Sequence, residues 1–219
     1  MKVQVSEGYY LREKYTTLKR FISYFYQIDV IRRCRPERIL LVGVGDGTVS
    51  HFLKQRYDVT TVDIDKSIGP DVVGDIQNMP FKDGEFDITC AFEVLEHLPF
   101  DNVEGGLKEM ARVSRRHIAV SLPHRSADFE VVLRFPLMRT LLKRDILRFH
   151  FGIPLSFPGF ESSGQHYWEI DRQKTPLTHV RSLLSRVGDI QKEIVPPLDT
   201  YHRFFLLTKH IASGNVEKK

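Results

Sequence analysis

The sequence has few residues of several types, and each shortage excludes a class of protein. Only two of its 219 residues are cysteines, Cys34 and Cys90, which are too few for a disulfide framework or a cysteine-based zinc site. No apolar run approaches the ~20 residues that a membrane-spanning helix requires. The first residues include an acid, Glu7, and no apolar stretch, so we expect no signal peptide. A reducing cytoplasm is the expected location.

The composition is that of a folded domain. Hydrophobic residues make up 42% of the chain and charged residues 27%, which allows a buried core and a solvated surface. The length suits one α/β domain with a modest lid. We expect a single domain over residues 1–212, with an N-terminal helical cap at 1–36 and a lid inserted at 123–172. Residues 213–219 are expected to form a flexible tail.

Runs of β-branched and apolar residues alternate with helical patterns. The expected strands are 38–42, 59–62, 71–73, 86–92, 117–122, 190–195 and 203–208. The expected helices are 9–33, 48–55, 103–115 and 176–187. This alternation predicts parallel pairing and a doubly wound, Rossmann-like α/β sheet, because parallel neighbours need crossover connections. Between the second and third strands only residues 66–70 are available, so we expect a loop or a single turn there.

A glycine-rich turn follows the first predicted strand. The strand runs into Gly43-Val44-Gly45-Asp46-Gly47 and then into a helix. Glycines allow a tight turn and a close ligand, and the helix start offers free N–H groups. The spacing is Gly-x-Gly-x-Gly, and Thr48 stands where a dinucleotide fingerprint requires its third glycine, which argues against an NAD oxidoreductase. Asp63 ends the next strand, where an acid can accept hydrogen bonds from ribose hydroxyls.

Two further motifs follow this turn. The first is Gly74-Asp75-Ile76-Gln77-Asn78-Met79-Pro80-Phe81, and the second runs from Phe86-Asp87 through a strand to Glu93-Val94-Leu95-Glu96-His97. As a set, these motifs resemble the class I S-adenosylmethionine-dependent methyltransferases, in particular the small family with Gly-Asp-x-x-x-x-Pro-Phe and Glu-His motifs. The resemblance covers residues 38 to about 122.

The resemblance implies a seven-stranded sheet with an antiparallel last strand at its edge, and S-adenosylmethionine as the cofactor. The cofactor-binding residues that it implies are Gly43, Gly45, Asp46 and Gly47 around the methionine part, Asp63 on the ribose, Ile64 against the adenine, Asp75 and Ile76 at the adenine amino group, and Glu93 beside the sulfonium. The sequence departs from the family at Leu41, where an acid usually contacts the cofactor's amino group. We hypothesise that Asp46 compensates.

Three histidines stand where a methyl acceptor should lie, because the carboxyl ends of parallel strands line the ligand crevice. His97 follows the fourth strand, His124 follows the fifth, and His166 lies in the expected lid. We take His97, His124 and Glu93 as catalytic candidates, with a structural role as the alternative for each histidine. Glu93-x-x-Glu96-His97 also resembles the metal-binding segment of methyltransferases of ubiquinone biosynthesis and of small-RNA ends. The Glu-His pair is widespread without a metal, and we assign no metal ligand.

The expected lid is basic and apolar. In residues 129–144 arginine and lysine alternate with leucine, phenylalanine and methionine, which we interpret as a helix that covers an anionic or lipid-linked acceptor or touches a membrane surface. An ordinary lid helix is the alternative. The formal net charge of +4 agrees with an anionic partner only weakly. No RNA-binding module is present, so we expect no stable nucleic-acid binding.

The sequence therefore predicts a methyltransferase whose O- or N-acceptor it does not identify. An aminopropyltransferase is the nearest rival enzyme, because Gly45-Asp46-Gly47 also occurs in that relative's turn. It requires an acidic polyamine pocket, against which the basic lid argues. A non-catalytic, methyltransferase-like partner subunit is the rival from another class. The departure at Leu41 allows it, and the intact Asp63 and Asp75 argue against it.

Overall fold

A seven-stranded sheet forms the centre of the computed structural model, which describes residues 16–124, 126–143, 146–154, 166–172 and 175–210. The strand order is β3-β2-β1-β4-β5-β9-β8. The strands are β1 (Arg38–Val42), β2 (Asp58–Asp63), β3 (Val72–Val73), β4 (Phe86–Phe92), β5 (Ser114–Pro123), β8 (Gly188–Ile194) and β9 (His202–Lys209). The strands β3, β2, β1, β4 and β5 pair in parallel, as predicted.

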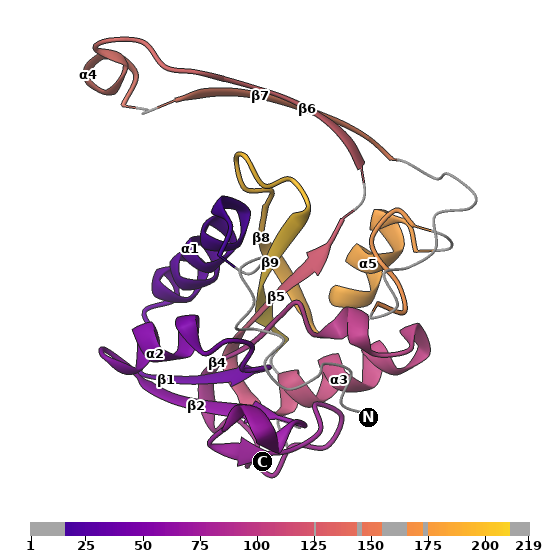
Figure 1. The fold of residues 1–219 in the computed structure, drawn as a ribbon. Coiled ribbons are helices and arrows are strands. Elements are labelled where there is room, and N and C mark those ends of the chain that lie inside the picture. Colours follow the sequence, from indigo (N-terminus) through magenta and orange to yellow (C-terminus); the bar gives the residue numbers. More distant parts are fainter. Residues whose placement is uncertain (1–15, 125, 144–145, 155–165, 173–174, 211–219) are drawn as a thin grey trace, which may run out of the picture.

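Helices cover both faces of this sheet (Figure 1). They are α1 (Leu18–Arg33), α2 (Thr48–Lys54), α3 (Phe100–Val113) and α5 (Leu177–Leu184). Alternate residues of β1 point to opposite faces. Leu40 packs in the core beneath α3 and α5, and Leu41 packs in the core beneath α1 and α2. Both faces of the central strands are therefore buried, which explains their continuous apolar sequence.

The connection from β2 to β3 is a single 3₁₀ turn, η3 (Lys66–Ile68), which confirms the predicted absence of a crossover helix. Asp71 stabilises this short connection through hydrogen bonds. Its carboxylate accepts hydrogen bonds from the Thr61 N–H and hydroxyl, both at 2.8 Å, and from Lys54. No helix within the described ranges is long and apolar enough to cross a bilayer.

The antiparallel last strand is confirmed, but its predicted position at the sheet edge is wrong. β9 lies between β5 and β8 and pairs antiparallel with both. The edge strand is β8, whose sequence Gly188-Asp-Ile-Gln-Lys-Glu-Ile194 is largely polar. Charged residues suit an edge because they discourage pairing with another chain. β9 contains a Phe204-Phe205-Leu206-Leu207 run in which three side chains are fully buried, and it therefore takes the inner place.

The predicted lid helix over residues 129–144 is also wrong. The chain forms a two-stranded antiparallel ribbon of β6 (Ser126–Leu133) and β7 (Leu147–Pro154), joined at its tip by the short helix α4 (Met138–Leu142). The ribbon extends from the body of the molecule as an arm (Figure 1). β7 alternates apolar and polar residues, Leu147-Arg-Phe-His-Phe151, which is the period of a strand. That alternation was the available signal for this strand.

Candidate active site

The glycine turn after β1 has a backbone that few residues other than glycine adopt. Gly43 has φ +85° and Gly47, which precedes the first residue of α2, has φ +78°. A Cβ on Gly43 would lie 2.5 Å from the Cγ2 of Val94, so β1 and the segment after β4 meet closely here. A Cβ on Gly45 would have no atom of the described residues within 4 Å. The turn is therefore tight against Val94 and open at Gly45.

Asp63, at the carboxyl end of β2, binds the backbone of this turn. One carboxylate oxygen accepts a hydrogen bond from the Val44 N–H at 2.8 Å, and the other accepts one from the Asp65 N–H at 2.9 Å. These two bonds fix the orientation of the carboxylate. Because each carboxylate oxygen has two acceptor positions, Asp63 keeps capacity for further donors such as ribose hydroxyls.

Asp46 is held by two donors. Its Oδ1 accepts from the Thr48 N–H at 2.9 Å, and its Oδ2 accepts from the Tyr24 hydroxyl at 2.5 Å. Helix α1 therefore reaches the glycine turn through Tyr24, a contact that the sequence did not suggest. The N-terminal helical cap is also expected to cover the cofactor with Tyr9, Tyr10 or Tyr15 near it, and these three residues lie outside the described part of the chain. Leu41 is buried in the core, and the compensating role of Asp46 stays a prediction.

The predicted adenine loop is a tight turn that follows β3. The Asp75 Oδ1 accepts a hydrogen bond from the Gln77 N–H at 2.9 Å, and the Asp75 carbonyl accepts one from the Asn78 N–H at 2.9 Å. Ile76 is buried in the core against Gly106, and Ile64 is half-buried after Asp63. The expected cofactor contacts of Asp75, Ile76 and Ile64 stay predictions.

Glu93, directly after β4, has a strained backbone. Its φ is +55°, which is uncommon for a residue with a side chain. Its N–H donates to Ser121 of β5, and the Ser121 hydroxyl donates to the Glu93 Oε1 at 2.8 Å. The Glu93 Oε2 lies 3.5 Å from the Nε2 of His202. The parallel neighbour β5 and the antiparallel strand β9 therefore hold the carboxylate of Glu93 between them.

His202 is a buried partner that the sequence analysis missed. Its Nδ1 lies 2.5 Å from the Asp199 Oδ2, so the imidazole bridges the carboxylates of Asp199 and Glu93. Burial alone would lower the pKa of His202, but the two carboxylates outweigh it and raise that pKa above its ordinary value. His202 lies opposite Pro123, where β9 begins beside the end of β5. An antiparallel strand thus brings its first residue to the carboxyl edge of the parallel strands.

Glu96 is fully buried in the 3₁₀ turn η4 (Leu95–His97). Among the described residues, no protein donor meets either of its carboxyl oxygens. Burial and the neighbouring Glu93 carboxylate raise the pKa of Glu96 well above its ordinary range.

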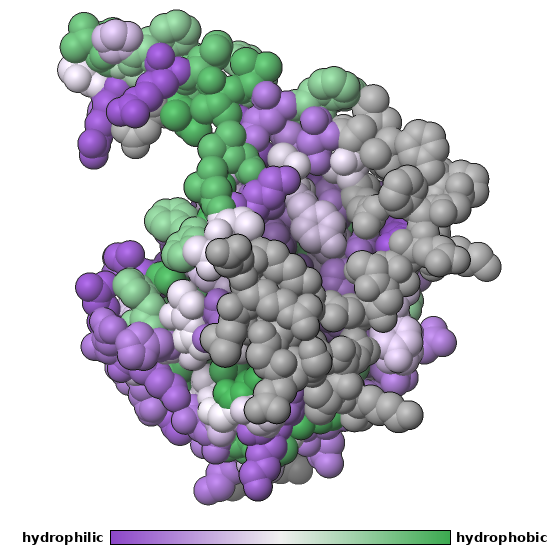
Figure 2. Space-filling view, viewed as in Figure 1, coloured by the Kyte–Doolittle hydropathy of each residue, from purple (hydrophilic) through white to green (hydrophobic). Residues whose placement is uncertain are grey.

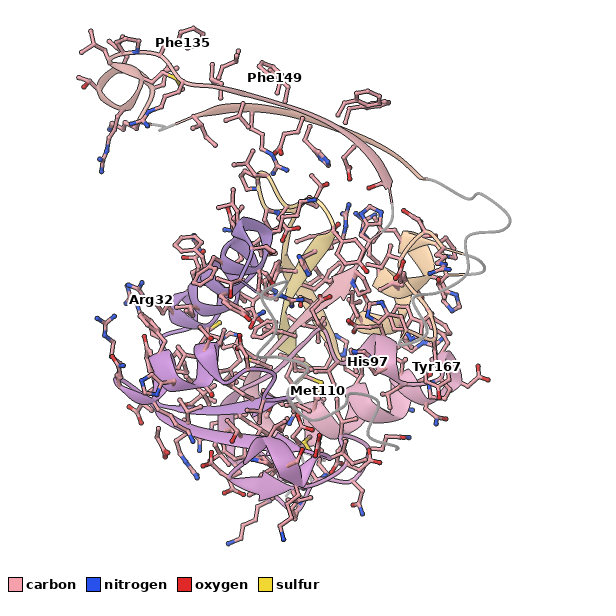
Figure 3. All side chains as sticks on the ribbon, in the orientation of Figure 1. Arg32, His97, Met110, Phe135, Phe149 and Tyr167 are labelled. Atoms are coloured by element: carbon pink, nitrogen blue, oxygen red, sulfur yellow. The ribbon has the colours of Figure 1, made fainter. Side chains whose placement is uncertain are left out.

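A second buried carboxylate, Glu169, lies beside this turn. Its Oε1 lies 2.9 Å from the Nδ1 of His166 and accepts from the Tyr201 hydroxyl at 3.2 Å. Burial and the nearby carboxylates, first that of Glu169, raise the pKa of Tyr201. The Tyr167 N–H donates to the Glu96 carbonyl at 2.9 Å, which joins this segment to η4. Figure 3 shows His97 and Tyr167 on the same side of the body.

Glu96, His97 and His166 could hold a divalent cation. One potential ligand atom of each lies within 4.8 Å of the other two, and the rings of His97 and His166 meet edge to face at 5.1 Å. Glu169 occupies the His166 Nδ1, which leaves Nε2 to face a ligand. Mixed oxygen and nitrogen ligands suit Zn²⁺ or Mn²⁺. The sequence placed Glu96 and His97 together, and the fold adds His166.

The second candidate histidine, His124, has surroundings that differ from those of His97. The Nε2 of His124 lies 2.7 Å from the Asp171 Oδ2, and its Nδ1 accepts from the Arg203 guanidinium at 3.1 Å. Burial lowers the pKa of His124, and the Asp171 carboxylate offsets this only in part. Both ring nitrogens of His124 are thus used within the protein. This geometry favours the structural alternative for His124, and its catalytic role stays a prediction.

Comparison with known proteins agrees with this geometry. Residues 40–117 match the family model described as "Methyltransferase domain". Over these residues the chain is similar to the class I methyltransferases. The matched part of this methyltransferase domain runs from β1 into β5, and so includes the glycine turn, Asp63, Asp75 and Glu93.

The relatives of this methyltransferase domain are distant. Demethylmenaquinone methyltransferase of Thermotoga maritima is 29% identical over 127 residues, which are 48% of this chain and 54% of the relative. The chain thus spans about half the length of this curated relative.

Two solved structures share the fold of the methyltransferase domain. Magnesium protoporphyrin IX methyltransferase of Synechocystis PCC 6803 with bound SAH has a TM-score of 0.60 and 15% identity, over 96% of this chain and 90% of that one. N-methyltransferase NodS of Bradyrhizobium japonicum WM9 in complex with S-adenosyl-L-homocysteine has a TM-score of 0.55 and 11% identity, over 94% of each chain.

Proposed function

We propose that this chain is an S-adenosylmethionine-dependent methyltransferase that modifies an oxygen or nitrogen of a small or medium acceptor. The observation that carries the proposal is the fixed carboxylate of Asp63 beside the glycine turn. Bonds to the Val44 and Asp65 N–H groups orient it, and the turn is open at Gly45. When bound there, S-adenosylmethionine supplies an electrophilic methyl group on its sulfonium.

The proposed cofactor contacts follow the chain from β1 to β4. They are the glycine turn with Gly43, Gly45, Asp46 and Gly47 for the methionine part, Asp63 for the ribose, Ile64, Asp75 and Ile76 for the adenine, and Glu93 near the sulfonium. These residues stand at the carboxyl ends of neighbouring parallel strands, where open α/β sheets bind their ligands. Their support is this common edge and the match to the methyltransferase domain.

Methyl transfer is an in-line displacement, so positioning contributes most of the catalysis. An acceptor hydroxyl or amine must also lose a proton, which a near-neutral base can accept. We assign this role to the imidazole of His97, at the edge beside Glu93. We assign to His124 the positioning of Asp171 and Arg203, because its ring nitrogens already bind these residues.

The acceptor side carries several acids, and this observation supports a second candidate. Glu93, Glu96 and Glu169 gather at the end of β4, and each raises the pKa of Tyr201 through its charge. Such a cluster favours a cationic acceptor, as an aminopropyltransferase also requires. The family match supports methyl transfer, so we keep aminopropyl transfer as the second candidate. Decarboxylated S-adenosylmethionine is the ligand that distinguishes it.

The test is isothermal titration of the native chain with S-adenosylmethionine and S-adenosylhomocysteine. Asp63→Asn should reduce the affinity by at least about tenfold, because a charge-assisted hydrogen bond contributes about 1.5–3 kcal/mol. Asp65→Asn is the matched control. Its carboxylate caps η3 through the Ser67 N–H and, among the described residues, makes no hydrogen bond to the glycine turn, so binding should survive.

The absence of binding to the native chain, with a native circular dichroism spectrum, would refute the enzyme assignment. It would favour the non-catalytic partner subunit instead. Binding that survives Asp63→Asn would refute the assigned cofactor contacts. After positive titration, the acceptor screen begins with glycan, lipid-linked and phosphorylated compounds. We propose the cytoplasm as the location, in keeping with the two free cysteines.

A further inference from the structure

The β6–β7 ribbon has one wholly apolar face. Residues directly opposite each other in an antiparallel pair point to the same face. The register pairs Phe129 with Phe151, Val131 with Phe149, and Leu133 with Leu147. Four of these side chains are more than half exposed: Phe129 (66%), Phe151 (64%), Phe149 (62%) and Val131 (52%). Three aromatic rings and three aliphatic side chains therefore form one continuous outer face.

The opposite face of the ribbon is mostly polar and is attached to the body. It carries Glu130 and Arg148, which form an ion pair. The Arg148 guanidinium donates to the Val195 carbonyl at 2.5 Å, and the Leu198 N–H donates to the Glu130 Oε2 at 2.8 Å. These bonds anchor the ribbon to the loop between β8 and β9. The anchored face lies toward the body, so the apolar face points away from it.

The figures show the same arrangement. In Figure 3 the side chain of Phe149 points away from the body, and Phe135 lies at the tip. In Figure 2 hydrophobic residues follow the outer side of the arm. A two-stranded ribbon alone is marginally stable, and monomeric proteins rarely expose a large continuous apolar patch. A face of this kind therefore indicates a partner.

The tip of the ribbon indicates the chemistry of that partner. Four apolar residues are more than half exposed there, namely Phe135 (53%), Leu137 (69%), Leu141 (75%) and Leu142 (53%). Arg134, Arg139 and Lys143 lie among them, all exposed. From residue 131 to residue 143 the sequence contains no acid. Apolar side chains interleaved with cations are the pattern of segments that lie in the interface of an anionic bilayer.

We propose that the outer face and tip of the β6–β7 ribbon bind the surface of an anionic phospholipid bilayer. The apolar side chains enter the boundary between headgroups and acyl chains, and Arg134, Arg139 and Lys143 meet lipid phosphates. A second copy that paired through the same tip would bring no acid to these cations, because residues 131–143 contain none. The ribbon would hold the methyltransferase domain at the bilayer, within reach of an acceptor that is itself lipid-linked.

The experiment is co-sedimentation of the full chain with vesicles of phosphatidylcholine alone and with a quarter of phosphatidylglycerol. We expect binding to the anionic vesicles and little to the neutral ones. Each cation near an anionic surface contributes about fivefold in partitioning, so Arg139→Gln with Lys143→Gln should weaken binding by about 25-fold. The matched control is Lys66→Gln with Lys82→Gln, which removes two exposed charges outside the ribbon, one in η3 and one before β4.

A second pair of variants tests the apolar face. Phe149→Ser should weaken binding by at least about tenfold, whereas Phe25→Ser, which alters a similarly exposed ring on α1 (60%), should not. Equal binding to both vesicle types, or binding unchanged by the tip and face variants, would overturn the proposal. Light scattering that shows a dimer lost on Phe149→Ser would assign the face to a second copy instead. Neither measurement requires cofactor, so failure here leaves the methyltransferase proposal intact.

Discussion

Alanine substitutions at Gly43 and Gly45 should separate backbone strain from steric contact in the cofactor turn. Both glycines have positive φ, +85° and +59°. A new Cβ at Gly43 would lie 2.5 Å from the Cγ2 of Val94, whereas a Cβ at Gly45 would meet no atom within 4 Å in the described part of the chain. The two variants therefore share the backbone penalty and differ in the collision.

The expected magnitudes follow from these two contributions. A left-handed backbone costs an alanine about 1–2 kcal/mol, so Gly45→Ala should lower the free energy of unfolding by about that amount. Overpacking against a buried neighbour adds about 1–3 kcal/mol, which applies to Gly43→Ala alone. Val94→Ala removes the colliding methyl group. In that background the excess cost of Gly43→Ala over Gly45→Ala should fall to near zero.

Urea unfolding of the four single and double variants measures these differences, with the native chain and Val94→Ala as references. Because Val94 directly follows Glu93, displacement of Val94 should also weaken S-adenosylmethionine binding, and Val94→Ala should restore part of it. Equal destabilisation by Gly43→Ala and Gly45→Ala would refute the close approach of β1 and the segment after β4. A persistent excess in the Val94→Ala background would place the collision elsewhere.

Three further predictions concern Glu96, Asp87 and Glu93. The pKa of Glu96 is raised in the folded state. Its contribution to stability is therefore present below its unfolded pKa and is lost as the pH rises. Glu96→Gln should stabilise the chain more at about pH 8 than at about pH 5, as thermal melts would show. The Glu37 and Arg38 N–H groups overcome burial and lower the pKa of Asp87 to about 2. Asp87→Asn should then cost about 2 kcal/mol at neutral pH and less toward pH 2, where the native contribution is lost, as urea titrations across pH would reveal. At Glu93, with φ +55°, glycine should be more stable than alanine by about 1 kcal/mol in urea, and the reverse order would show that the strain is absent.

The sequence predicted the sheet well because its strands are buried on both faces. Such strands are short apolar runs, and the glycine turn and Asp63 mark their carboxyl ends. The ribbon was not predicted, because residues 129–144 combine apolar and basic residues in a way that also suits an amphipathic helix. The decisive alternation lies in β7, which begins at Leu147, after this segment. The position of β9 depends on burial of Phe204 and Phe205, and no local pattern determines strand order.

The candidate site was predictable where neighbouring strands supply it and not where distant segments do. Asp63 and Glu93 follow successive parallel strands, so topology alone brings them to one edge. His202 reaches Glu93 only because β9 is antiparallel and begins opposite Pro123. Glu169 lies at the site because Tyr167, two residues before it, donates its N–H to the Glu96 carbonyl. These contacts depend on strand register and on the course of an insertion, and neither follows from a single sequence.

The strained and buried acids at the end of β4 are consistent with a site shaped for a ligand rather than for stability. Glu93 keeps a positive φ although glycine would adopt it without strain, and Ser121 and His202 hold its carboxylate in place. Glu96 lies beside it, fully buried and without a protein donor among the described residues. Both features cost stability, and a fold optimised for stability alone would replace them. Their coincidence at the edge that carries Asp63 supports a positively charged group between them, as the sulfonium of the proposed cofactor would provide.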